Sequence, residues 1–134
     1  MNDPKRVLIV DDDEGVAFTI ESYLEMEFDD AVECATFTTP SCGKASLEWL
    51  KTNRPDWAVL DLILNGVNGF KIVNSILEKY KGVPILIISG CAKGSDEIVE
   101  ATKLTMNRDF NIKFATKMHL ADTISKECGV IRDA

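Results

Sequence analysis

The alternation of short apolar runs with longer amphipathic segments constrains the fold of this 134-residue chain more than any other feature. Each of five mostly apolar runs is followed by a segment whose apolar residues recur at helical spacing. This pattern is typical of βα units, which build a parallel sheet with helices packed against it. We therefore predict a single α/β domain over residues 1–134. Its strands are expected at 6–10, 31–37, 57–64, 84–89 and 110–116.

The amphipathic segments between these runs predict the helices. Hydrophobic residues make up 46% of the chain, which is enough for one core at this length. A fourth helix is expected within 90–106, where Ser95 can cap it. The other helices are expected at 14–28, 41–53, 70–80 and 119–128, the last ended by Gly129.

The composition argues against several classes of protein. A net charge of -7 and a pI near 4.7 disfavour binding to nucleic acid or to an anionic membrane, because phosphate groups attract a basic surface. The first apolar run is too short for a signal peptide, and no stretch approaches the ~20 apolar residues of a membrane span. The four cysteines form no CxxC pair and are expected to be reduced thiols in a cytoplasmic protein.

Polar residues follow the predicted strands at the points where the strands end. In open parallel sheets ligands bind beyond the carboxyl ends of the strands, so these residues are expected to converge. Asp11 and Asp12, with Asp61 opposite, offer the hard oxygen ligands that suit Mg²⁺. The ion would offset the repulsion among the acids, and a magnesium site implies phosphoryl chemistry. Asp13 is expected to cap the first helix instead of joining the metal site.

Four segments in the right order carry a resemblance to a known family: VLIVDDDE, PDWAVLDLILNGVNGF, PILIISG and FATKMHL. Together they resemble the receiver domain of two-component response regulators, over essentially the whole chain. The resemblance implies a flavodoxin-like three-layer sandwich with a doubly wound five-stranded parallel sheet in the order 2-1-3-4-5. It also implies Mg²⁺-dependent transfer of a phosphoryl group to Asp61 from a histidine kinase or a phosphotransfer protein.

The resemblance assigns roles to individual residues. Asp61 would be the phosphoacceptor and also a metal ligand. Phe114 would change rotamer on activation, although the alternation along 110–116 makes plain burial in the core an equal alternative. The remaining assignments are Asp11, Asp12 and the backbone carbonyl of Ile63 as metal ligands, Lys117 and Ser89 as phosphoryl-binding residues, and Ser89 as the partner of Phe114 in the switch.

A receiver of this kind catalyses its own phosphorylation and dephosphorylation but has no turnover substrate, so it is not expected to be an enzyme in the usual sense. Phosphorylation adds roughly -1.5 to -2 charge and would switch a protein-interaction surface. That surface would act on a downstream protein or on a fused effector domain, and dimerisation through the fourth and fifth helices is a family-level alternative. The sequence leaves open whether the receiver stands alone or belongs to a longer regulator.

Two positions depart from the family pattern. The family usually has proline where Asn65 and Met118 stand. Without proline a cis bond costs ~2.5–4 kcal/mol, which disfavours cis at Lys117–Met118, but the sequence leaves open whether this bond is cis or trans. The residues two past the phosphoacceptor and the switch hydroxyl, Ile63 and Cys91, offer no strong hydrogen-bonding group to align a water. We therefore expect slow autodephosphorylation.

Two alternative functions fit parts of the sequence. The first is a degenerate receiver that is never phosphorylated and acts as a constitutive protein-interaction module. The second is a phosphohydrolase of the haloacid dehalogenase type, with Asp11 as the nucleophile and Asp13 as the acid/base. The short chain argues against the phosphohydrolase, which would also leave Asp61 without a role.

Overall fold

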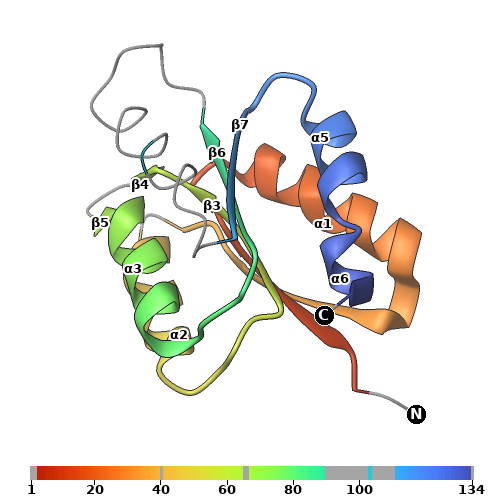
Figure 1. Ribbon diagram of the computed structural model, residues 1–134. Coiled ribbons are helices and arrows are strands. Elements are labelled where there is room, and N and C mark those ends of the chain that lie inside the picture. Colours follow the sequence, from red (N-terminus) through yellow and green to blue (C-terminus); the bar gives the residue numbers. More distant parts are fainter. Residues whose placement is uncertain (1–2, 40, 65–66, 90–102, 104–110, 134) are drawn as a thin grey trace.

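Five parallel strands form the central sheet of the protein (Figure 1). The computed structural model describes residues 3–39, 41–64, 67–89, 103 and 111–133. The sheet order is β2-β1-β3-β6-β7, so these five strands, numbered along the chain, follow the predicted order 2-1-3-4-5. The strands are β1 (Lys5–Val10), β2 (Val32–Phe37), β3 (Trp57–Asp61), β6 (Ile85–Ser89) and β7 (Ile112–Thr116).

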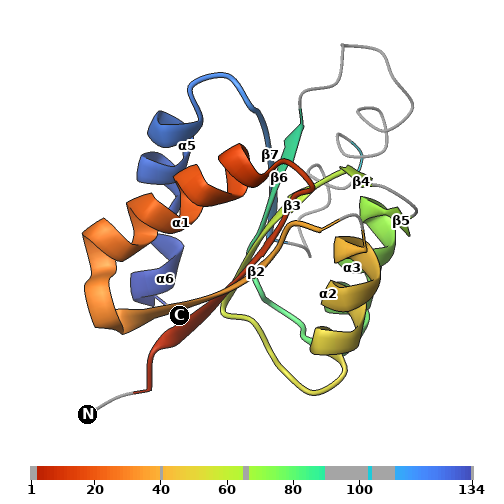
Figure 2. The same cartoon turned by 180° about the vertical axis from the view of Figure 1, so that it is seen from behind.

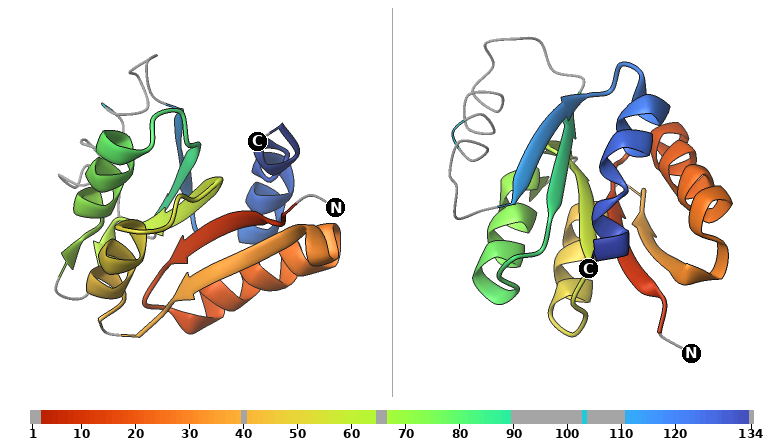
Figure 3. Two further views of the ribbon diagram at one scale, coloured as in Figure 1. Left: turned by 90° about the horizontal axis from the view of Figure 1, so that it is seen from below. Right: turned by 45° about the vertical axis from the view of Figure 1, so that its right-hand side comes forward.

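Helices cover both faces of this sheet. Figures 2 and 3 show α2 and α3 on one face and α1, α5 and α6 on the other. A 3-10 turn at Asp29–Ala31 links α1 to β2. The predicted helix within 90–106 lies outside the described residues. The helices are α1 (Glu14–Phe28), α2 (Cys42–Leu50), α3 (Gly69–Lys79), α5 (Leu120–Glu127) and α6 (Val130–Asp133).

The sheet separates two hydrophobic cores, and alternate residues of β1 contribute to each. Leu8 and Val10 belong to the core beneath α2 and α3, whereas Val7 and Ile9 belong to the core beneath α1 and α5. Every residue of β3 and β6 is buried, as expected for central strands covered on both faces. The near-continuous apolar runs in the sequence therefore arise from burial on both sides of the sheet.

The third strand is shorter than predicted. The sequence indicated a strand over 57–64, but β3 ends at Asp61, and β4 (Ile63–Leu64) pairs antiparallel with β5 (Val67–Asn68). The chain turns here because the Gly69 N–H donates to the Leu62 carbonyl over 2.9 Å. This contact draws the start of α3 against the end of β3.

The C-terminal region also differs from the prediction. The helix predicted at 119–128 does end before Gly129, since α5 stops at Glu127, but the short helix α6, which was not predicted, follows. Ile131 is buried, and an Arg132 guanidinium nitrogen lies 2.7 Å from Glu27 Oε1 on α1. The same guanidinium lies 5.0 Å from the centroid of the Phe28 ring. These contacts hold α6 against the end of α1.

Two further findings concern the thiols and the helices. Cys34, Cys42 and Cys128 are free thiols, and Cys91 lies outside the described residues. Among the helices that the structure describes, none combines the length and the apolar character needed to cross a bilayer.

Candidate functional site

Strand register brings the predicted polar residues to one edge of the sheet. Val10 pairs with Leu60, so the next residues, Asp11 and Asp61, lie side by side at the carboxyl ends of β1 and β3. Asp61 itself pairs with Ile88, the residue before Ser89. On the far side Ser89 pairs with Thr116, and the Ser89 carbonyl accepts the Lys117 N–H at 3.1 Å. The four strand ends therefore present their polar residues to one another.

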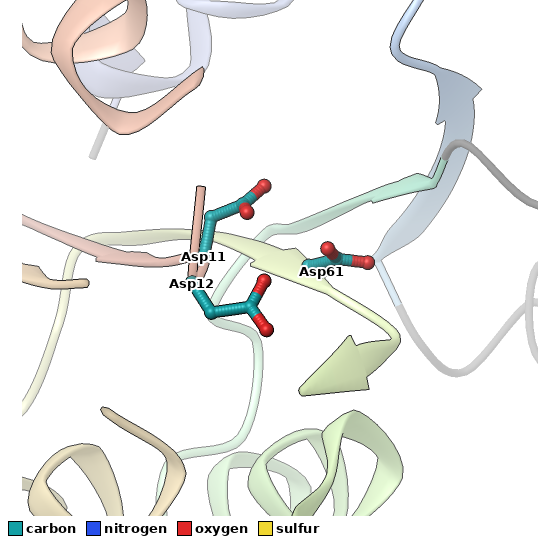
Figure 4. A group of neighbouring side chains, drawn as sticks. All are labelled: Asp11, Asp12 and Asp61. Atoms are coloured by element: carbon teal, nitrogen blue, oxygen red, sulfur yellow. The ribbon is translucent and has the colours of Figure 1, made fainter. Parts of the chain in front are cut away.

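Three carboxylates meet at this edge. Asp11, Asp12 and Asp61 each offer one oxygen, and these oxygens lie within 4.8 Å of one another. Figure 4 shows the three side chains leaving the ends of β1 and β3 with their carboxyl groups on the same side. Asp11 and Asp61 are buried, whereas Asp12 is exposed. The cluster therefore has two buried ligands and one side open to solvent.

Lys117 lies between the two buried acids. Its Nζ is 2.8 Å from Asp61 Oδ2 and donates a hydrogen bond to it. The same ammonium lies 3.0 Å from Asp11 Oδ2 as an ion pair and 3.4 Å from Asp11 Oδ1. One cation thus lies beside two carboxylates. Its charge offsets part of the repulsion between them that the sequence predicted.

The pKa values at this edge reflect burial and charge together. Burial raises the pKa of Asp11 above its usual range, which outweighs the lowering by the Asp13 N–H and by Lys117, and the charge of Asp61 raises it further. Burial alone would lower the pKa of Lys117, but its contacts with Asp61 and Asp11 raise it overall. The lysine therefore stays charged at neutral pH. Ionisation of Asp11, in contrast, costs free energy because its carboxyl group is buried.

The carboxylate of Asp11 has an unsatisfied oxygen. Asp11 Oδ2 is the one buried side-chain polar atom of the described residues that lacks a hydrogen-bond partner, because the ammonium beside it is not aligned for a hydrogen bond. A buried oxygen without a partner is costly, and this one belongs to the three-carboxylate cluster. Carboxylate oxygens are the ligands that Mg²⁺ prefers. The residues present fit a hard divalent cation.

Local backbone contacts hold the two buried acids in place. Asp13 caps α1, as predicted, because its side chain accepts hydrogen bonds from the Gly15 and Val16 amides, and its own N–H donates to Asp11 Oδ1 at 2.8 Å. Gly69 packs directly against the chain that follows Asp61. A Cβ on Gly69 would lie 2.3 Å from the Asp61 carbonyl oxygen. The role of Gly69 is not visible in the sequence, because it depends on a contact between backbone segments.

The remaining predicted residues take the following positions. Ser89 is buried at the end of β6, and Ile63 begins β4, two residues beyond Asp61. Phe114 is half-buried and packs against the core beneath α2 and α3. It therefore contributes to the core without being enclosed by it. Asn65 and Cys91 lie outside the described residues.

The segment after Lys117 departs from regular geometry. No peptide bond between described residues is cis, so the Lys117–Met118 bond, which the sequence left open, is trans. Met118 is 71% exposed. His119, at the N-terminus of α5, adopts left-handed backbone angles of φ 55° and ψ 44°. Such angles are uncommon outside glycine, so the chain enters α5 through a strained residue.

This arrangement, an acidic cluster and a lysine at the carboxyl edge of a doubly wound sheet, defines a class of signalling domain. The family model of the response regulator receiver domain matches residues 7–125. The protein therefore belongs to the response regulator receiver domain family and functions as a receiver domain of two-component signalling. Asp13, which the phosphohydrolase alternative would use as an acid/base, is occupied as a helix cap.

Curated relatives are response regulators. The chain is 32% identical over 109 residues to the heme response regulator HssR of Staphylococcus aureus strain MRSA252, covering 79% of this chain and 46% of the relative. It is 31% identical to HssR of strain Newman, with the same coverage. The chain thus spans about half the length of the curated relatives it matches.

Solved structures share the fold. A CheY-like receiver domain protein from Methanospirillum hungatei JF-1 aligns with a TM-score of 0.70 at 20% identity, covering 97% of this chain and 95% of that one. CheY4 of Vibrio cholerae gives a TM-score of 0.70 at 22% identity, covering 96% and 98%. The response regulator domain of Thermotoga maritima CheB gives 0.70 at 20%, covering 98% and 96%.

Proposed function

We propose that this receiver accepts a phosphoryl group on Asp61 from a phosphohistidine of a histidine kinase or phosphotransfer protein. The observation that carries the proposal is the Asp61 carboxylate at the sheet edge, hydrogen-bonded to Lys117 over 2.8 Å and flanked by Asp11. The ammonium holds the Asp61 carboxylate in place, and a carboxylate oxygen can act as the nucleophile.

Mg²⁺ is the proposed cofactor. The residues that would hold it are Asp11, Asp12 and Asp61, with the backbone carbonyl of Ile63. The support is the cluster of three carboxylates and the unsatisfied Oδ2 of Asp11. When bound, the ion supplies positive charge to the acids and to the phosphoryl oxygens.

In the proposed reaction an Asp61 oxygen attacks phosphorus as the bond from phosphorus to the donor imidazole breaks, which leaves an aspartyl phosphate and a free histidine. Negative charge spreads over the three equatorial phosphoryl oxygens in the transition state. Lys117 and the Ser89 hydroxyl lie on the β6–β7 side of Asp61, where they would stabilise this charge. Lys117 would exchange its bond with the carboxylate for one with the phosphoryl group.

Ser89 and Phe114 are the proposed switch. Ser89 would move towards the phosphoryl group, and Phe114 would change rotamer in response. The support is their placement on neighbouring strands, with Phe114 opposite Ile87 and Ser89 opposite Thr116, and the incomplete burial of Phe114. The output surface would be formed by β7, α5 and the helix predicted within residues 90–106.

Family membership supports four wider parts of the proposal. We place residues 1–134 in one receiver domain that lies in the cytoplasm and has no turnover substrate. Its target would be a downstream protein or a fused effector domain, and phosphorylation would favour a homodimer. Binding to nucleic acid or to a membrane is not part of the proposal, because the net charge of -7 would repel their phosphate groups.

Intact mass after incubation with acetyl phosphate and Mg²⁺ tests the phosphoacceptor. Wild type should gain one phosphoryl group that is lost on treatment with hydroxylamine, and Asp61→Asn should gain none. Asp13→Asn is the matched control, because asparagine also caps helices and should leave the adduct intact. Loss of the adduct from the Asp61 variant alone would support the assignment.

Two outcomes of this experiment would overturn parts of the proposed function. If wild type shows no adduct although Mg²⁺ stabilises the folded protein, Asp61 is not a phosphoacceptor and the degenerate receiver becomes the better interpretation. If the adduct forms but decays with a half-life of seconds, the expectation of slow autodephosphorylation fails.

A further inference from the structure

A hollow along the outer side of α2 is separate from the site described above. It has a volume of about 610 Å³, within the range of protein binding pockets. Figures 2 and 3 show α2 beside α3, on the face of the sheet away from α1, α5 and α6. The residues that line this α2 hollow are Ser41, Lys44, Ala45, Leu47, Glu48 and Lys51. The roles proposed for the acidic cluster, Lys117 and the switch use none of them.

The face that carries α2 and α3 is basic, although the chain as a whole is acidic. Residues 41–56 and 69–84, which contain these two helices, have six basic and three acidic side chains. Residues 11–31, which contain α1 on the other face, have nine acidic side chains and no lysine or arginine. The net charge of -7 therefore hides a separation of charge, with the positive side at α2 and α3.

Lysines of this face are available to a partner. Lys44 and Lys71 are exposed, and neither takes part in an ion pair with another described residue. Lys51 pairs with Glu48 over 2.8 Å, but the two side chains are 61% and 74% exposed. Such a pair contributes little to stability, so Lys51 can exchange Glu48 for the carboxylate of a partner.

Apolar side chains lie between the two lysines of the α2 hollow. Lys44 and Lys51 are seven residues apart, which is about two helical turns and about 10 Å along the axis. Ala45 and Leu47 lie between them in the sequence and are only half-buried. The helix itself is held in place at its end, because the Tyr80 hydroxyl donates to the Leu50 carbonyl over 2.6 Å. The α2 hollow is therefore an apolar surface with a cation at each end.

We propose that the α2 hollow binds an amphipathic acidic helix of a partner protein. Two carboxylates of that helix would pair with Lys44 and Lys51, and apolar side chains between them would cover Leu47 and Ala45. Acidic residues seven positions apart on a helix have the same spacing as the two lysines, so a helix lying along α2 matches both. Nucleic acid matches less well, because Glu48 and the apolar residues would face its phosphates. The inference goes beyond the proposed function and does not depend on it.

Titration of the full chain with a model peptide tests this site. The probe is an acetylated and amidated alanine-rich helical peptide with two glutamates seven positions apart and two leucines midway between them. Its matched control has glutamine in place of both glutamates. Backbone amide NMR shifts should move saturably at Lys44, Leu47 and Lys51 with the glutamate peptide. The glutamine peptide should bind about fivefold or more weakly, the loss expected for two exposed ion pairs.

Variants separate the α2 hollow from the other lysines. Lys44→Gln should weaken binding about two- to fivefold, as expected for one exposed ion pair. Lys51→Gln should weaken it by at least as much, because it also leaves Glu48 without its cation. Both side chains are exposed, so neither variant should unfold. Lys126→Gln, an exposed lysine in the last turn of α5 on the other face, is the control and should change nothing.

Four outcomes would overturn the proposal. The first is equal binding of the two peptides, and the second is unchanged affinity in Lys44→Gln and Lys51→Gln. The third is loss of binding in Lys117→Met, which would place the peptide at the phosphoacceptor edge and not in the α2 hollow. The fourth is displacement of the peptide by a lower concentration of a single-stranded oligonucleotide of equal charge, which would assign this face to nucleic acid.

Discussion

The two sides of the acidic edge are built differently. On the β1–β3 side, Asp11 follows the four buried residues that end β1, Asp61 is the last residue of the fully buried β3, and Gly69 packs against the backbone behind Asp61. On the β6–β7 side, Lys117 follows β7, an edge strand with only one fully buried residue, and the chain enters α5 through the left-handed His119. The carboxylates are thus fixed by backbone packing, whereas the ammonium reaches them on a long side chain.

This difference separates two requirements of the site. Carboxylates that share a cation must keep fixed positions, because small shifts change the repulsion among them. A lysine that would exchange a carboxylate for a phosphoryl group must be able to move. We therefore expect the backbone behind Asp61 to tolerate no added atoms, and the lysine that follows β7 to act through its charge.

The largest effect should come from Gly69→Ala. The new Cβ would lie 2.3 Å from the Asp61 carbonyl oxygen and 2.8 Å from Leu62 Cα, both backbone atoms that cannot rotate away. The free energy of unfolding should fall by about 3 kcal/mol or more, measured by urea denaturation. Gly129→Ala is the matched control: nothing lies within 4 Å of its Cβ, and it should change stability by less than about 1 kcal/mol. Equal effects of the two substitutions would contradict the tight packing behind Asp61.

Lys117→Met should have the next largest effect. It removes the cation that lies 2.8 Å from Asp61 and 3.0 Å from Asp11. Because the lysine side chain is 24% exposed, the loss without metal should be about 1–2 kcal/mol, below the value for a fully buried pair. Mg²⁺ should reduce this loss, since a bound ion offsets the same two carboxylates. Thermal unfolding with and without Mg²⁺ measures both quantities.

Lys113→Met is the control for that experiment. Lys113 also lies on β7 and pairs with Glu127 over 3.0 Å, but its side chain is 60% exposed. Its substitution should cost less than about 1 kcal/mol and should not respond to Mg²⁺. A Lys117 effect as small as that of Lys113 would show that the buried acids do not depend on the lysine.

The contrast between the two sides also explains what the sequence could predict. The strands β1, β3 and β6 and their terminal acids were predictable, because burial on both faces produces unbroken apolar runs that end abruptly in polar residues. The cap at Asp13 was predictable because capping is local to the helix start. Strand order and the family itself followed from motifs in a fixed order.

Features that depend on contacts between distant segments were not predictable. Gly69 is one example: its N–H bonds to the Leu62 carbonyl, and its Cα lies close against the backbone of Asp61 and Leu62, just where β3 ends. In α2 the buried positions include Ser46, whose hydroxyl bonds to the Gly43 carbonyl within the helix, whereas Trp49 is only half-buried. A hydroxyl satisfied inside its own helix gives no hydrophobic signal.

A smaller, pH-dependent effect should follow from Asp11→Asn. Burial, the main cause, raises the pKa of Asp11, so ionisation of this group lowers the stability of the metal-free protein at neutral pH. The variant should be more stable than wild type at pH 7, by on the order of 1 kcal/mol. The difference should shrink as the pH falls through the raised pKa, because wild type then becomes neutral at this position too.

Urea denaturation at several pH values, without divalent metal, checks this prediction. Glu33→Gln, an exposed acid on the edge strand β2, is the control and should show no gain at pH 7. A gain for Asp11→Asn that stays constant down to acidic pH would mean that the amide improves packing and that the charge is not the cause.

The smallest effect should come from His119→Gly. The left-handed backbone of His119 costs a residue with a Cβ about 1 kcal/mol or more, and glycine adopts it without strain. Glycine also gains freedom in the unfolded chain, so the net result should be a stabilisation of about 0.5 kcal/mol. Asp122→Gly, in the first turn of α5, has no such strain to relieve and should destabilise the protein by about 0.5–1 kcal/mol. If His119→Gly destabilises as much as Asp122→Gly, the histidine side chain holds the entry to α5, and the β7 side is constrained as tightly as the β1–β3 side.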